Sequence, residues 1–245
     1  MKTLVIIPSR LSASRLPGKP LLKINGLSMI SHVFKKAEEA DIGEVIVAAE
    51  DQEIIEDVKK NGGNAILTSN QHKTGTDRIY EAFQKLNTSN IDLIMNLQGD
   101  EPLMNIKDIK ILNKQMIINS SQLGTLASVI KDKKLFDDIN IVKLITSEIL
   151  NDQNFPEVKG FSRKIIERSE YIYHHLGIYC YTVNTLKKFV ALQQSSNEIK
   201  NKLEQLRALD NGLKINVALA ETSSIGVDTE EDLVAIKKIM EYKVK

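Results

Sequence analysis

The sequence predicts an α/β fold in which helices cover a mostly parallel sheet, and two observations support this prediction. Short apolar runs rich in β-branched residues, of which Leu4 to Ile7 is the first, are typical of strands buried on both faces. These runs alternate with segments whose apolar residues recur at helical spacing. Repeated β-α-β units of this kind form parallel sheets covered by helices.

The predicted elements alternate regularly through the first half of the chain. The first strand leads into a loop, residues 8–20, that is rich in Ser, Gly, Pro and Arg. Ser28 is a candidate cap for a helix with one apolar face, and Asp51 begins a second helix that ends at Gly62-Gly63. The other elements predicted in this half are strands at 44–49, 65–67, 91–97 and 125–130, and helices at 77–86 and 105–118.

The alternation weakens after residue 131. The elements predicted there are strands at 142–149, 176–181 and 214–220, helices at 185–192, 198–209 and 229–242, and an irregular segment at 151–163. Because we find neither an internal repeat nor a low-complexity linker, we expect one domain, residues 1–245, with a less regular stretch at about 131–175.

Composition excludes several classes of function. Lys and Arg total 33 against 32 for Asp and Glu, so a formal net charge of +1 provides no general attraction for nucleic acid or membranes. The single cysteine, Cys180, excludes an intramolecular disulfide and a Cys-rich zinc site, and its apolar surroundings predict a core residue. The chain has no run of 18 apolar residues, and its first apolar run is too short for a signal peptide. We therefore expect a soluble, cytoplasmic protein.

The loop after the first strand carries a candidate phosphate site. Arg10, Arg15 and Lys19 place three cations within ten residues, with Ser14 and Gly18 among them. In a parallel sheet ligands bind beyond the carboxyl ends of the strands, where glycine lets backbone N–H groups approach phosphates closely. The loop matches neither the P-loop pattern nor the three-glycine dinucleotide fingerprint. Three cations at this position suit a triphosphate.

Two acidic turns are candidate metal ligands. Asp100 follows an apolar strand within Gln98-Gly99-Asp100-Glu101-Pro102, and Asp228 precedes the terminal helix. A carboxylate beside a triphosphate implies Mg²⁺, which binds one or two carboxylates together with phosphate oxygens. For Asp228 an alternative stays open: with Glu231 three residues later, it resembles the N-cap of a capping box.

These turns suggest a mechanism for the transfer of a nucleotidyl group. Mg²⁺ between Asp100 and Asp228 would bind the α-phosphate and an acceptor hydroxyl, lowering the pKa of the hydroxyl and aligning it for in-line attack. Arg15 and Lys19 would stabilise the charge on departing pyrophosphate. No histidine base is required.

Several segments in order along almost the whole chain resemble the 3-deoxy-manno-octulosonate cytidylyltransferase family. The element Arg15-Leu16-Pro17-Gly18-Lys19 is shared with other sugar nucleotidyltransferases, whereas His175-Leu176-Gly177-Ile178-Tyr179 and Glu204-Gln205-Leu206-Arg207 are more specific. The other matching segments are Pro8-Ser9-Arg10, Gly75-Thr76-Asp77-Arg78, Gln98 to Pro102 and Val227 to Asp232.

The resemblance implies a Rossmann-like nucleotidyltransferase fold, a cytoplasmic homodimer with residues 131–175 as a candidate dimerisation lobe, Mg²⁺ dependence and a role in lipopolysaccharide precursor synthesis. It implies that CTP is coupled to an eight-carbon 2-keto sugar acid, Kdo, giving CMP-Kdo. By position, the residues implied to hold CTP are Arg10, Ser14, Arg15, Lys19, Gly75 and Thr76; those implied to line the sugar-acid site are Gln98, Arg163, His175, Tyr179, Glu204 and Gln205; and those implied to bind magnesium are Asp100 and Asp228. Several members of the family have a proline shortly after Phe-Ser-Arg, whereas this chain continues Lys164-Ile165-Ile166-Glu167.

Other functions remain open at this level. The acceptor can be Kdo, its 8-amino analogue or another acidic sugar, since one substituent can be read by a few pocket groups. A non-catalytic nucleotide-binding module would be expected to lose metal ligands or phosphate cations, yet Asp100, Asp228 and the three loop cations are all present. A metal-dependent glycosyltransferase would need an Asp-x-Asp motif where this chain has Gly99-Asp100-Glu101.

Overall fold

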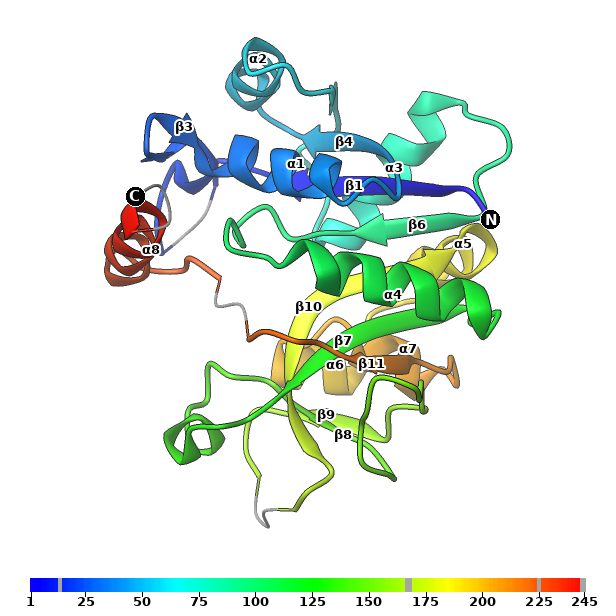
Figure 1. Cartoon of the computed structure of the whole chain (residues 1–245). Coiled ribbons are helices and arrows are strands. Elements are labelled where there is room, and N and C mark those ends of the chain that lie inside the picture. The colour runs from blue at the N-terminus through cyan, green and yellow to red at the C-terminus, as the bar shows by residue number, and fades with distance from the viewer. Residues whose placement is uncertain (13–14, 166–168, 224–225, 243–245) are drawn as a thin grey trace. The chain divides into compact units, whose positions relative to one another are not determined.

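The computed structural model describes residues 1–12, 15–165, 169–223 and 226–242 (Figure 1). The chain forms two compact units. The first unit comprises Lys2–Ile91, Met95–Ile106 and Ser224–Lys245, and the second comprises Met1, Asp92–Ile94 and Lys107–Ser223.

The first unit is built on a sheet with strand order β6-β1-β4-β5. Strand β1 (Thr3–Ser9) pairs in parallel with β4 (Gly43–Ala49), and β4 pairs in parallel with β5 (Ala65–Leu67); the boundary between the units falls within β6 (Leu93–Asn96). The side chains from Leu4 to Ile7 are fully buried. Burial on both faces, which the β-branched run predicted, is therefore confirmed.

Helices α1 (Met29–Glu39), α2 (Gln52–Lys60) and α3 (Gly75–Leu86) pack against this sheet. Ser28 caps α1 as predicted, because its side chain accepts the Ser31 N–H. Between β1 and α1 the chain forms the short 3₁₀ helix η1 (Lys19–Leu21) and a small hairpin of β2 (Lys23–Ile24) and β3 (Leu27–Ser28). None of these three elements was predicted from the sequence.

The terminal helix α8 (Glu230–Tyr242) completes the first unit. Its Leu233 and Ile236 are buried in an apolar cluster with Ile24, Met29 and Val227. Leu16 and Leu103 pack against the same cluster, so α8 rests on the loop and the turns that carry the predicted site residues. Ile239 of the same helix is exposed.

The second unit is built on strands that mostly run antiparallel. The long strand β10 (Ile172–Thr182) pairs antiparallel with β7 (Leu123–Val129) and with β8 (Lys143–Ile145). Strand β8 also pairs antiparallel with β9 (Gly160–Ser162), and β11 (Asn216–Leu219) pairs in parallel with β7. Strand β8 covers only part of the predicted segment 142–149.

The remaining helices of the second unit are η2 (Lys133–Phe136), α4 (Ile106–Ile118, which begins at the boundary), α5 (Val183–Ala191), α6 (Ser196–Asn201) and α7 (Leu206–Asp210). The single helix predicted at 198–209 is wrong. Lys202 adopts a left-handed conformation with φ of 52°, which ends α6 before α7 begins.

The prediction of an α/β fold with a largely parallel sheet covered by helices is confirmed, and the antiparallel strand β10 is the main departure from it. Over the part of the chain that the structure describes, no helix has the length and apolar character needed to cross a bilayer.

Candidate active site

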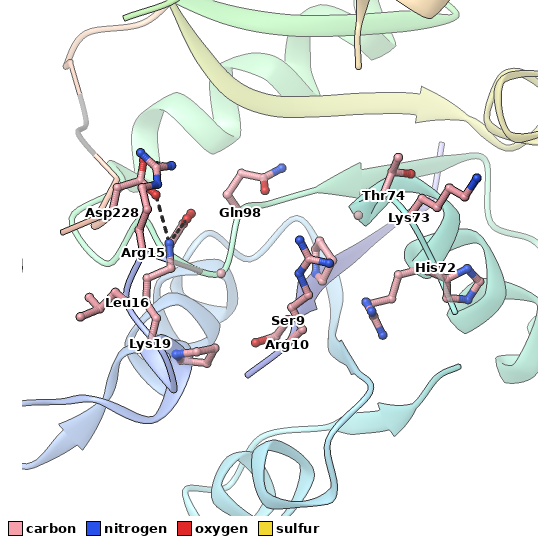
Figure 2. A pocket seen from close by; sticks show the side chains of 16 residues that line it. Ser9, Arg10, Arg15, Leu16, Lys19, His72, Lys73, Thr74, Gln98 and Asp228 are labelled. Carbon is pink, nitrogen blue, oxygen red and sulfur yellow. Dashed lines mark hydrogen bonds and ion pairs between the residues drawn. The ribbon is translucent and has the colours of Figure 1, made fainter. Parts of the chain in front are cut away.

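A pocket of about 320 Å³ opens in the first unit beyond the carboxyl end of β1 (Figure 2). This volume lies within the range of small-molecule sites. The pocket is lined by Pro8, Ser9, Arg10, Arg15, Leu16, Lys19, Pro20, His72, Lys73, Thr74, Gly75, Arg78, Gln98, Gly99, Asp100 and Asp228. The expectation that the loop after β1 and the turn at Asp100 meet at one edge of the sheet is confirmed.

Hydrogen bonds to the backbone hold the loop after β1 in place. Its Leu11 N–H donates to Asp51 Oδ2 over 2.8 Å, and Gly18 N–H donates to Leu11 O over 3.1 Å. Gly18 has a φ of 68°, a conformation that costs other residues about 1–2 kcal/mol. The turn at Gly18 begins η1 and so fixes the backbone of Lys19 at the pocket wall.

Lys19 joins the two acidic turns. Its Nζ donates to Asp100 Oδ2 at 2.6 Å, to Val227 O at 2.7 Å and to Asp228 Oδ1 at 3.3 Å. Arg15 Nη2 forms an ion pair with the other carboxylate oxygen of Asp228 at 2.9 Å. The dashed lines in Figure 2 mark contacts of this cluster, and Arg10 stands apart from it. The cluster contains all four residues predicted to be catalytic.

The turn at Asp100 packs closely against β1. A Cβ added to Gly99 would lie 3.1 Å from Pro8 O, so only glycine fits here without displacement. The turn is joined to the segment before α8 by a 2.9 Å hydrogen bond from Val227 N–H to Asp100 O. This bond brings together two aspartates that lie 128 positions apart in the sequence (228 minus 100).

The capping role that the sequence allowed for Asp228 is wrong. Thr229 Oγ1 accepts the Asp232 N–H at 3.2 Å, and Asp232 Oδ2 accepts the Thr229 N–H at 2.9 Å, which is the reciprocal pattern of a capping box. Thr229 caps α8, and the carboxylate of Asp228 contacts Lys19 and Arg15 instead.

The other predicted nucleotide residues are placed as follows. Arg10 and Gly75 line the pocket, and Arg10 has no ion-pair partner among the residues that the structure describes. Thr76 is buried in the first turn of α3. Gln98, which was predicted for the sugar-acid site, also lines the pocket. Ser14 lies outside the described residues.

Sequence reasoning missed part of the pocket wall. His72, Lys73 and Thr74 precede α3, and Thr74 caps this helix by accepting the Asp77 N–H at 3.2 Å. The spacing of Thr74 and Asp77, three residues apart after a short strand, is the signal that could have indicated a structured turn here. Ser9 was not assigned a role either. Its hydroxyl, at the end of β1, is buried without a hydrogen-bond partner among the described residues.

Two ion pairs support this wall. Arg78 is buried and pairs with Glu50, and it also donates to Thr68 Oγ1 at 2.7 Å. His72 contacts Glu81, which also accepts from Lys85 at 2.7 Å. Burial alone would raise the pKa of Glu81, but hydrogen bonds from Lys85, His72 and a backbone N–H outweigh it and lower that pKa to about 2.

The remaining predicted sugar-acid residues lie in the second unit, where His175 and Tyr179 belong to a row of aromatic rings. The His175 ring centroid lies 5.0 Å from that of Phe161 and 5.5 Å from that of Tyr179. Between His175 and Tyr179 the register of β10 against β7 shifts, as expected for a bulge that re-aims side chains. Burial lowers the pKa of His175 to about 3. A neutral imidazole can donate or accept, but it cannot serve as a cation for a sugar acid.

Glu204 and Gln205 occupy the turn between α6 and α7. Gln205 is buried. Burial, together with the charges of Tyr181 and Glu204, raises the pKa of Tyr179 well above its ordinary value. Glu204 therefore lies near the Tyr179 hydroxyl.

Arg207 of α7 is buried in the interior of the second unit, beside Glu198. Its Nε donates a hydrogen bond to Glu198 Oε2 at 2.9 Å, and its Nη2 donates to Glu198 Oε1 at 2.6 Å. Its guanidinium also lies 4.8 Å from the Phe189 ring centroid.

Arg163 follows β9 and is engaged with backbone carbonyls. Its guanidinium donates to Ile139 O at 3.1 Å, Asn201 O at 3.3 Å and Lys202 O at 3.4 Å. Its own carbonyl accepts from the buried Lys143 at 3.1 Å. Its predicted role in binding a carboxylate stays a prediction.

A parallel α/β unit with cations and paired carboxylates beyond its first strand has the architecture of a nucleotidyltransferase, and comparison with known proteins agrees. Residues 4–215 match the family described as cytidylyltransferase. The chain is 42% identical to the 3-deoxy-manno-octulosonate cytidylyltransferase of Afipia carboxidovorans over 97% of this chain and 96% of that protein. It is 40% identical to the protein of the same name from Thermodesulfovibrio yellowstonii over 98% of both chains.

A solved structure agrees as well. The structure of CMP:2-keto-3-deoxy-manno-octonic acid synthetase complexed with CTP superposes with a TM-score of 0.89 at 33% identity, covering 99% of this chain and all of that one. The chain belongs to the 3-deoxy-manno-octulosonate cytidylyltransferase family.

Proposed function

We propose that this protein transfers CMP from CTP to 3-deoxy-D-manno-octulosonate and releases pyrophosphate. The anomeric hydroxyl attacks the α-phosphorus, a new P–O bond forms, the bond to the β-phosphate oxygen breaks, and the hydroxyl proton is lost. The observation that carries the proposal is the pocket beyond β1, where Arg10, Arg15 and Lys19 meet Asp100 and Asp228 in a chain of this family. Nucleotidyl transfer needs that combination of phosphate cations and carboxylates.

The chain's own residues bind and orient the nucleotide. Arg10 is exposed at the pocket and has its guanidinium available for phosphate oxygens, which it can bind with two parallel hydrogen bonds. The buried Ser9 hydroxyl supplies a further hydrogen bond at the end of β1. Gly75 and Gly99 lack side chains where the nucleotide would pass close to the backbone. Ser14 and Thr76 complete the proposed set.

Mg²⁺ is proposed as the cofactor, and the donor set suits it. Asp100 and Asp228 share a cationic partner and both border the pocket, so two hard carboxylate groups face the place where phosphates would bind. Among the described residues, no group of three or more His, Cys, Asp or Glu is arranged to hold a metal ion. Mg²⁺ is commonly bound by one or two carboxylates together with phosphate oxygens and water. When bound, the ion would neutralise phosphate charge and acidify the attacking hydroxyl.

Gln98, which lines the pocket of the first unit, is proposed to contact the acceptor. For Arg163, His175, Tyr179, Glu204 and Gln205 of the second unit, contact with the sugar acid remains a prediction from the sequence. The 8-amino analogue of Kdo, or another acidic sugar, is the alternative acceptor. The test is pyrophosphate release with CTP and Mg²⁺ and either Kdo, its 8-amino analogue or no acceptor. Release with Kdo that greatly exceeds release without acceptor is the expected result. No release with any acceptor, combined with CTP binding in a titration, would instead support a non-catalytic nucleotide-binding module.

We also propose that the protein is a cytoplasmic homodimer whose product serves lipopolysaccharide synthesis. Residues 131–175 are the proposed dimerisation lobe of a single domain, 1–245. Ile139, Ile149 and Tyr171 in this stretch, and Val129 just before it, are large apolar residues that are exposed in the chain alone. Light scattering after size exclusion should give twice the 27.5 kDa mass of one chain, and Ile139→Asp combined with Ile149→Asp should give monomers. A monomeric wild-type protein would overturn this proposal.

A further inference from the structure

We propose that Lys19 is an internal counter-ion that keeps divalent metal away from Asp100 and Asp228 until nucleotide phosphates draw its ammonium out of the cluster, so that metal enters with the nucleotide. This inference rests on the proposed function, because it assigns an order of events at the same site.

The hydrogen bonds of Lys19 are all in use. An ammonium group has three donors, and Lys19 Nζ has three acceptors within 3.3 Å, namely one oxygen from each aspartate and the carbonyl of Val227. A phosphate oxygen therefore has to displace one of these acceptors. Lys19 is a phosphate ligand only after it has released at least part of the cluster.

Three of the four carboxylate oxygens of Asp100 and Asp228 contact a cation in the same arrangement. Asp228 gives Oδ1 to Lys19 and Oδ2 to Arg15, while Asp100 gives Oδ2 to Lys19. Magnesium requires oxygen ligands at short distances and loses its water reluctantly. Direct coordination by Asp228 would bring a dication beside Lys19 and Arg15, and their positive charges oppose it.

The charges lead to the same conclusion. Lys19, Arg15, Asp100 and Asp228 together carry two positive and two negative charges, so the cluster is neutral and offers a dication no net attraction. When Lys19 moves away the cluster carries one negative charge. A triphosphate supplies a stronger anionic partner for the ammonium, and Arg10, which makes no ion pair with the described residues, already stands in the same pocket.

The exchange needs only a movement of the side chain. The backbone of Lys19 is held by η1, by the buried Pro20 and by the hydrogen bond from its N–H to Leu16 O at 3.2 Å. The Asp100 and Val227 turns remain joined by their own backbone bond when the ammonium leaves. By linkage, a nucleotide that strengthens metal binding is itself bound more tightly by the same factor when metal is present.

The first test measures Mn²⁺ binding to nucleotide-stripped protein, from the loss of the free-ion electron paramagnetic resonance signal. Lys19→Ala and Lys19→Gln should each bind Mn²⁺ about tenfold or more tightly than the wild type, because one positive charge close to a dication has been removed. Arg10→Ala is the matched control, since it also removes a pocket cation but leaves the carboxylates paired, and its Mn²⁺ affinity should change less than threefold. Adding Asp228→Asn to Lys19→Gln should abolish the gain.

If Lys19 only tied the two turns together, its loss would weaken Mn²⁺ binding or leave it unchanged. That outcome would overturn the proposal.

A second measurement uses wild-type protein only. Mg²⁺ alone should leave the melting temperature unchanged, whereas Mg²⁺ with CTP should raise it more than CTP in EDTA does. Stabilisation by Mg²⁺ alone equal to that seen with CTP would also overturn it. Neither test involves an acceptor sugar or turnover, so failure of the proposed transferase activity would be seen separately.

Discussion

The buried ion pair between Glu198 and Arg207 provides a sharp test of how the second unit is stabilised. Both side chains are almost completely excluded from solvent, and two hydrogen bonds of 2.9 and 2.6 Å join them. Glu198→Gln removes the negative charge that accepts both hydrogen bonds, and it leaves the buried guanidinium with the more distant carboxylate of Glu204, 4.0 Å from Nη2. Breaking a buried pair in this way costs about 3–5 kcal/mol. In a protein of this size that loss corresponds to a fall in melting temperature of roughly 6–20 °C.

The assay is urea unfolding of four proteins: the wild type, Glu198→Gln, Arg207→Met and the double variant. The double variant should be more stable than Glu198→Gln, because replacing both partners leaves no unpaired charge. Additive losses in the two single variants, with no recovery in the double variant, would refute the view that the pair acts as a unit. A loss below about 1 kcal/mol in Glu198→Gln would show that the pair behaves like an exposed one.

The same pair predicts a dependence on pH. Burial alone would raise the pKa of Glu198, but the hydrogen bonds from Arg207 and Gln194, together with the charge of Arg207, outweigh it and hold that pKa below its ordinary value. A lowered folded-state pKa means that the stabilisation is complete above the unfolded pKa, near 4.5, and is lost as the pH falls through the folded value. Glu198→Gln should therefore lose this part of the acid sensitivity, as measured by urea midpoints at pH 7 and pH 4.

Three further predictions concern the first unit. Asp100→Asn should lower the rate of pyrophosphate release about 100-fold or more with an unchanged circular dichroism spectrum, because Asn keeps the shape but loses the charge; turnover at the wild-type rate would remove Asp100 from the site. Gly18→Ala should cost about 1–2 kcal/mol in urea unfolding, whereas Gly18→Asn should cost less, since Asn tolerates the φ of 68° better; equal losses would contradict the left-handed turn. Glu81 has a pKa of about 2, so its contribution to stability should be present above pH 4.5 and fade below it, and Glu81→Gln should flatten the urea midpoints between pH 5 and pH 3.

The strands and the first loop could be predicted from the sequence because their signals are local. A run such as Leu4 to Ile7 has no polar residue to place at a surface, and a loop with three cations directly after it falls at the carboxyl edge in any parallel sheet. The same reasoning placed Asp100 correctly.

Features that depend on distant partners could not be predicted. Thr229 and Asp228 compete for the same capping position on local grounds, and what decides between them is the contact of Asp228 with Lys19, which lies 209 residues away. The break in the helix predicted at 198–209 likewise follows from tertiary contacts. Arg207 reaches back to Glu198, and the chain must turn at Lys202 to allow it.

The cations that line the pocket differ in how costly it is to break their ion pairs. Arg78 lines the pocket and is buried, and only 10% of the side chain of its partner Glu50 is exposed. Giving up that ion pair for a phosphate would leave a largely buried carboxylate without this counter-charge. Arg15 is 60% exposed and its partner Asp228 is 43% exposed, so water compensates when their contact breaks. Lys19 lies between these cases, because its side chain is 13% exposed while those of its aspartate partners are more exposed. A ligand can therefore exchange the contacts of Arg15 and Lys19 at modest cost, whereas the contact of Arg78 is fixed and serves to hold the pocket wall that these residues face.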